Sequence, residues 1–150
     1  MSVILFSNSL RDRIDFAKEA EILKNQGKYE MAYIKLITDP NVDKESELYQ
    51  QLHVIQSLNK QISYYSSAIA LDNREEALDA LIVGVEKYDN DHKKAKSLAV
   101  ASEYTEVYKE LIGLLKKDFK ITVSEAREIS YISSDEEYTE RIAFVCEASK

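Results

Sequence analysis

The sequence predicts an all-α fold: a helical bundle of about seven helices, organised as stacked helical hairpins with two long helices. Only three glycines and one proline occur in 150 residues, so few positions interrupt a helix. Apolar residues recur at helical spacing along most of the chain. Hydrophobic residues make up 45% and charged residues 31%, which is typical of a globular protein, and the length suits one domain, residues 1–150.

The chain begins with a short apolar arm, residues 1–8. We expect this arm to be covered, either by the core of the chain or by a second subunit. Ser9 and Asp12 have the spacing of a reciprocal helix cap, and the apolar stripe that follows predicts a first helix to about Asn25. Gly27 can adopt the left-handed backbone conformation that ends a helix.

A second, shorter helix is expected from about Lys28 to Thr38, because Pro40 disfavours helical geometry in the residue before it. The longest uninterrupted pattern follows, over Asp43–Leu71, with Asp43 as the expected cap. Two interpretations of its stripe are open: it packs within the chain, or it forms a coiled-coil seam with a second copy. The stripe repeats every seven residues, at Leu48, Ile55, Ile62 and Ile69.

The next helix is expected to begin after Asn73, a cap residue, and to run to about Tyr88. Gly84 falls near its apolar side, where the close approach of a neighbouring helix would explain a glycine. The segment Asp89-Asn-Asp91 has the composition of a turn. It therefore predicts that the second long helix begins there and covers about Asp91 to Lys117, packed against the first long helix.

Residues 121–150 predict a pair of short helices that folds back on the long ones. Thr122 to Glu125 and Ser134 to Glu137 both match the cap pattern at a helix start. Cys146 lies on the apolar side of the last helix, where we expect it to fill space in the core.

No pattern in the sequence indicates a catalytic or metal centre, so we expect no enzymatic activity and no cofactor. The glycines are too few and too scattered for a nucleotide-binding loop. The two histidines, His53 and His92, lie far apart, and neither follows a glutamate at the spacing that di-iron bundles use.

The net charge of −7 argues against nucleic-acid binding, which needs clustered lysine and arginine. The single cysteine cannot form an internal disulfide, which suits a reducing compartment. The apolar run at the start is too short to span a bilayer. We therefore expect a cytoplasmic protein with no nucleic-acid partner and no membrane partner.

Tyrosine is unusually abundant, with ten in a chain that has no tryptophan. Six tyrosines fall on or beside the predicted apolar stripes and are candidate partner-binding residues: Tyr29, Tyr33, Tyr64, Tyr65, Tyr104 and Tyr108. They either pack at the edge of the core or form a groove or interface, in which aromatic side chains would anchor a partner.

The spacing of small and bulky residues around the first hairpin resembles the tetratricopeptide repeat: Phe16, Ala20, Leu23, Gly27, Tyr29, Ala32 and Leu36. The segment Gly27-Lys-Tyr-Glu-Met-Ala32 is similar to the turn and second-helix start of that family. The resemblance covers roughly half of the chain. It implies a stack of helical hairpins with a concave face that binds a protein or peptide, because one hairpin cannot bury its apolar side alone.

Two functional hypotheses follow from these observations. The first is a non-enzymatic protein–protein interaction module, an adaptor or regulator, with a homodimer as one form of its association. The second is a ligand-sensing helical bundle with an internal pocket for a peptide or small apolar molecule. A surface groove that is apolar or lined by tyrosine would favour the first, and a buried cavity lined by tyrosine and leucine would favour the second.

Overall fold

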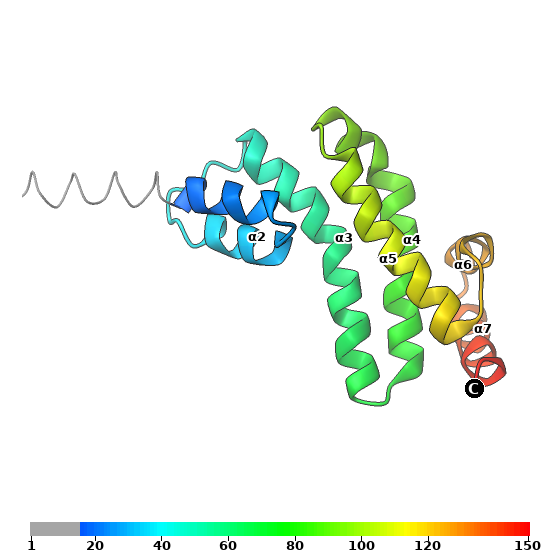
Figure 1. Ribbon diagram of the computed structural model, residues 1–150. Coiled ribbons are helices and arrows are strands. Elements are labelled where there is room, and N and C mark those ends of the chain that lie inside the picture. The colour runs from blue at the N-terminus through cyan, green and yellow to red at the C-terminus, as the bar shows by residue number, and fades with distance from the viewer. Residues whose placement is uncertain (1–15) are drawn as a thin grey trace, which may run out of the picture.

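The computed structural model describes residues 16–150, and every regular element in that range is a helix (Figure 1). The prediction of an all-α helical bundle is confirmed. The apolar arm and the expected cap at Ser9 and Asp12 lie outside the described residues. A helical segment at 16–25 is followed by α2 (Tyr29–Ile37), α3 (Glu47–Ala70), α4 (Arg74–Ser97), α5 (Ala101–Phe119), α6 (Val123–Ser130) and α7 (Asp135–Ala148).

Helix α4 is the centre of the bundle, because it contacts α3, α5, α6 and α7. The segment 16–25 and α2 form an N-terminal hairpin that packs on the first half of α3, away from α6 and α7 (Figure 1). The C-terminal pair, α6 and α7, folds back on α4, as the sequence predicts. No helix in residues 16–150 is long and apolar enough to cross a membrane.

The core has a large part around α4 and a small part under the N-terminal hairpin. Ile55 and Ile62 of the heptad stripe are buried, and Leu48 and Ile69 are half-buried and pack against the same two parts, so the stripe packs within the chain. Two tyrosines join helices across the bundle by hydrogen bonds that their hydroxyls donate to carboxylates. Tyr65 of α3 pairs with Asp118 of α5, and Tyr138 of α7 pairs with Asp79 of α4.

Several helix starts agree with the cap patterns. Asn73 accepts a hydrogen bond from the Glu76 amide, and Thr122 with Glu125 forms a complete capping box. The expected cap of the long helix, Asp43, is wrong. Ser46 caps α3 by accepting a hydrogen bond from the Tyr49 amide, whereas Asp43 accepts one from the Glu45 amide and closes the preceding turn.

The predicted turn at Asp89-Asn-Asp91 is also wrong, because α4 continues through it to Ser97. The chain turns instead at Leu98 to Val100, where Ala99 adopts a left-handed conformation with φ of 61°. Asp89 does not cap a helix: its carboxylate accepts two hydrogen bonds from Arg127 of α6, at 2.7 and 3.1 Å. The preference of aspartate and asparagine for turns is weak, and tertiary contacts override it here. The second long helix is therefore α4.

The close approach expected at Gly84 is confirmed. A Cβ atom at this position would overlap with Cδ1 of Leu111, which comes from α5, and would lie 3.5 Å from Cβ of Gln61 on α3. The glycine thus lets three helices meet at one point near the middle of α4.

Candidate functional site

Three of the six candidate tyrosines belong to the core rather than to a binding surface. Tyr65, Tyr104 and Tyr108 are buried, and Tyr104 has an exposed fraction of 0%. The Tyr104 ring stacks on Tyr88 at 5.5 Å between centroids, and its hydroxyl donates to the backbone carbonyl of Lys87 at 3.2 Å. Burial raises the pKa of Tyr104, so its phenol keeps the proton that it donates. These three side chains cannot contact a partner without unpacking the bundle.

The other three tyrosines lie in two different places. Tyr29 lines a polar hollow beside Asn59 and Glu106. Tyr33 and Tyr64 line a second hollow of about 280 Å³, which we call the α3 hollow. The six tyrosines therefore do not form one surface. The α3 hollow is lined by Tyr33, His53, Gln56, Ser57, Lys60, Gln61, Tyr64 and Lys87.

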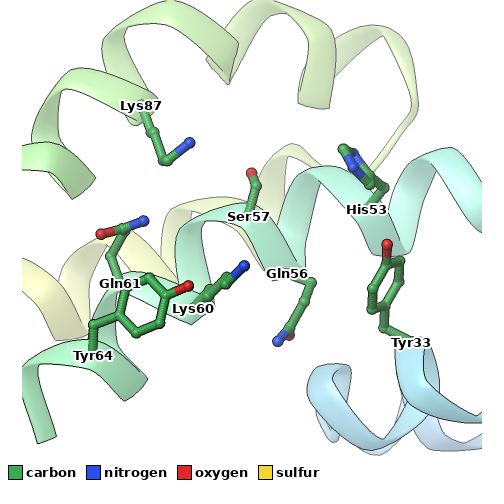
Figure 2. Close-up of a pocket in the computed structure, with 8 residues that line it drawn as sticks. All are labelled: Tyr33, His53, Gln56, Ser57, Lys60, Gln61, Tyr64 and Lys87. Carbon is green, nitrogen blue, oxygen red and sulfur yellow. The ribbon is translucent and has the colours of Figure 1, made fainter. Parts of the chain in front are cut away.

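The α3 hollow is a trough along one face of α3 (Figure 2). Tyr33 rises from α2 on one side, and Lys87 extends from α4 on the other side. The remaining six lining residues come from α3 itself. The ammonium of Lys60 lies over the Tyr64 ring, 5.4 Å from its centroid, a cation–π contact that orients both side chains.

An aromatic cluster orients the residues at the α2 end of the hollow. The His53 ring stacks on Tyr49 at 5.8 Å and meets the edge of Tyr33 at 6.1 Å. Burial and the neighbouring Tyr49 hydroxyl raise the pKa of Tyr33 to about 12. The Tyr33 phenol is therefore protonated at neutral pH.

Two buried glutamines on α3 are used in different ways. Gln51 is 8% exposed, and its amide joins three parts of the fold. It accepts from the Lys24 ammonium at 2.9 Å and donates to the Leu98 carbonyl at 2.8 Å and to Glu47 at 3.2 Å. Gln61 is 6% exposed, yet no hydrogen bond joins its amide to another group of the described residues. Its amide borders the α3 hollow, so its donors and acceptor are available there.

A second candidate surface lies on the N-terminal hairpin, on the side that faces away from α3. It is an apolar groove of about 530 Å³ between the helical segment 16–25 and α2. Ile22, Met31 and Ile34 on its walls are 47%, 56% and 51% exposed. We call it the hairpin groove; it is lined by Phe16, Glu19, Ile22, Leu23, Gln26, Met31, Ile34, Lys35 and Thr38.

Residues 16–150 contain no group of three or more histidine, cysteine, aspartate or glutamate side chains placed to hold a metal ion. His53 is exposed at the α3 hollow, and His92 lies within α4 with its ring stacked on Tyr88 at 5.4 Å. Cys146 is buried, and its burial raises the pKa of the thiol above the ordinary value, which disfavours the reactive thiolate.

No protein-family model, curated protein or solved structure matches the chain. The resemblance to tetratricopeptide repeats stays a prediction. The α3 hollow and the hairpin groove are the surfaces of residues 16–150 that indicate a function.

Proposed function

We propose that the chain is a non-enzymatic interaction module that binds a partner protein through the hairpin groove. One observation carries the proposal: three large apolar side chains, Ile22, Met31 and Ile34, stand about half exposed on two adjacent helices. Isolated apolar residues are common on protein surfaces. A contiguous group that lines a groove is a feature of protein–protein interfaces.

The shape of the groove favours a helix as its occupant. The hairpin is a layer of two helices, and its inner side is already buried on α3 through Ala20, Ala32 and Leu36. No part of residues 16–150 covers the outer side, and a third helix that places an apolar stripe between the two would complete the stack. The partner segment is therefore an amphipathic helix with apolar residues at helical spacing.

The edge of the groove supplies polar contacts around this apolar centre. Lys35 forms an ion pair with Glu19 across the two helices at 2.6 Å, and its ammonium lies 5.5 Å from the centroid of the Phe16 ring. Gln26 and Thr38 stand among the residues that line the groove. An apolar centre with polar groups around it is the usual anatomy of an interface.

A photo-crosslinking amino acid at position 34 tests the proposal, with the same amino acid at position 71 as the control. Leu71 is 80% exposed and lies at the α3–α4 turn, away from the groove. We expect position 34, but not position 71, to crosslink to one partner protein in extracts of the native cell. Binding of that purified partner should weaken by roughly tenfold or more in Ile34→Asp and stay unchanged in Leu71→Asp.

Three results would contradict the proposal. Crosslinks from position 34 that lead only to a second copy of the chain would assign the groove to a homodimer. Crosslinks that lead only to residues 1–8 would assign it to the apolar arm of the same chain. Equal binding of the partner by Ile34→Asp and Leu71→Asp would place the interface elsewhere on the molecule.

A further inference from the structure

The α3 hollow shares no residue with the hairpin groove. Its polar side chains are not accounted for by a site that binds an apolar helix. Buried polar groups in folded proteins are almost always hydrogen-bonded to protein or to ordered water. Gln51 follows this rule with three internal partners. Gln61, on the same helix, has no hydrogen-bond partner among the described residues, and it is not among the fully enclosed unpartnered groups, so its amide meets solvent at the hollow. A polar ligand in the hollow would take the place of that solvent as its partner.

The charges around the hollow specify the sign of the ligand. None of its eight lining residues is a carboxylate, and two are lysines, Lys60 and Lys87. Neither lysine forms an ion pair with a carboxylate within residues 16–150. Helix α3 has a single carboxylate, Glu47, at its first position. The hollow is thus a locally basic site in a chain of net charge −7, which favours an anion.

The aromatic side chains and the volume specify the rest of the ligand. Tyr33, His53 and Tyr64 provide ring surfaces and two phenol groups around the polar floor. The Ser57 hydroxyl donates to the Val54 carbonyl at 2.8 Å, so its oxygen can only accept a further hydrogen bond. The volume of about 280 Å³ is just below the usual range for small-molecule sites, enough for one ring and one charged group.

We propose that the α3 hollow binds a small aromatic phosphate. Lys60 and Lys87 bind the phosphate, the Gln61 amide donates to one of its oxygens, and the ring of the ligand packs against Tyr64. The site goes beyond the protein-binding function proposed above and does not depend on it.

Calorimetric titration of the full chain with phenyl phosphate tests the proposal, with phenol and inorganic phosphate as the two halves of that probe. We expect phenyl phosphate to bind more tightly than either half, because only the whole probe reaches both the lysines and the rings. Its affinity should fall as salt is added. Uridine monophosphate and O-phosphotyrosine contain the same two groups, and the tighter of the two identifies the natural source as a nucleotide or a modified amino acid.

Matched variants connect the binding to the hollow. The double variant Lys60→Gln/Lys87→Gln should lose affinity for phenyl phosphate by about tenfold or more. The control Lys94→Gln/Lys117→Gln removes the same charge from exposed positions on α4 and α5, and should bind as the unchanged chain does. Gln61→Leu should lose affinity while the chain stays as stable as before, because it removes no hydrogen bond within residues 16–150.

The proposal is overturned if phenyl phosphate does not bind, or binds no better than phenol. It is also overturned if the two double variants lose affinity equally, since the attraction would then arise from the total charge. Amide chemical shifts measured during the titration provide an independent criterion. Shifts that move outside the α3 hollow and not within it would place the bound phosphate at another site.

Discussion

Gly84 offers the most direct test of how α3, α4 and α5 pack together. In Gly84→Ala the new methyl group would overlap with Cδ1 of Leu111, and Leu111 is fully buried, so it cannot move into solvent. Overpacking of this kind costs about 1–3 kcal/mol. Replacing glycine by alanine within a helix stabilises the helix by about 1 kcal/mol. We therefore expect the free energy of unfolding to fall by about 0–2 kcal/mol.

Gly113→Ala is the matched control, because Gly113 lies within α5, is exposed, and has open space where the methyl group would stand, with no heavy atom within 4 Å. This variant should gain about 0.5–1 kcal/mol in the free energy of unfolding. Denaturant unfolding followed by far-UV circular dichroism measures both variants. In a Leu111→Ala background, which vacates the space, Gly84→Ala should become stabilising. Equal stabilisation by the two glycine substitutions in the unchanged background would refute the packing argument.

Three further predictions concern the internal polar contacts and the helix ends. Gln51→Leu should lower the free energy of unfolding by about 1–3 kcal/mol in denaturant titrations, because it leaves the Leu98 carbonyl and the Lys24 ammonium without this partner. Ala99→Gly should raise that free energy by up to about 1 kcal/mol by relieving the left-handed backbone, a gain that would be absent if the chain turned elsewhere. Burial raises the pKa of Tyr104, so its contribution to stability is complete below about pH 10 and is lost as the pH rises through the folded-state pKa. In Tyr104→Phe, the melting temperature should therefore fall less steeply with pH on the alkaline side. An unchanged slope of melting temperature against pH would contradict this role of Tyr104.

The helices could be predicted because their signals are local. Ile55 and Ile62 fall on one face of α3 at helical spacing, and that face is the one buried in the core. Thr122 and Glu125 lie three residues apart, and the capping box that they form involves only the first turn of α6. A period or a cap of this kind depends on neighbouring residues, which the sequence displays directly.

The turn at Asp89-Asn-Asp91 could not be excluded in the same way, because the contact that overrides it is distant. Asp89 pairs with Arg127, 38 residues further along the chain, and nothing near Asp89 indicates that partner. The true turn contains Ala99, a residue with no preference for the left-handed conformation that it adopts. Local propensity therefore favoured a position about two and a half helical turns too early.

The candidate site was predictable only in part, and for a related reason. Helical spacing places Tyr33, Tyr64 and Tyr104 beside apolar stripes. It does not show which of these side chains stay exposed to solvent after the other helices have packed. Tyr104 is covered, whereas Tyr33 and Tyr64 border the α3 hollow. The lack of carboxylates in α3 after Glu47 is visible in the sequence and is a usable signal of a basic surface.

The continuity of α4 determines where one lining residue of the α3 hollow, Lys87, lies within its helix. If α4 ended at Tyr88, Lys87 would lie in its last turn. Its carbonyl would then have no backbone amide of a later helical residue from which to accept a hydrogen bond. Because α4 continues to Ser97, Lys87 is held within a regular helix, and its carbonyl also accepts the Tyr104 hydroxyl. The side chain of Lys87 then extends over α3 to the hollow that Gln61 borders (Figure 2). The contact that the sequence does not reveal, between Asp89 and Arg127, thus lies beside the residue that completes the proposed site.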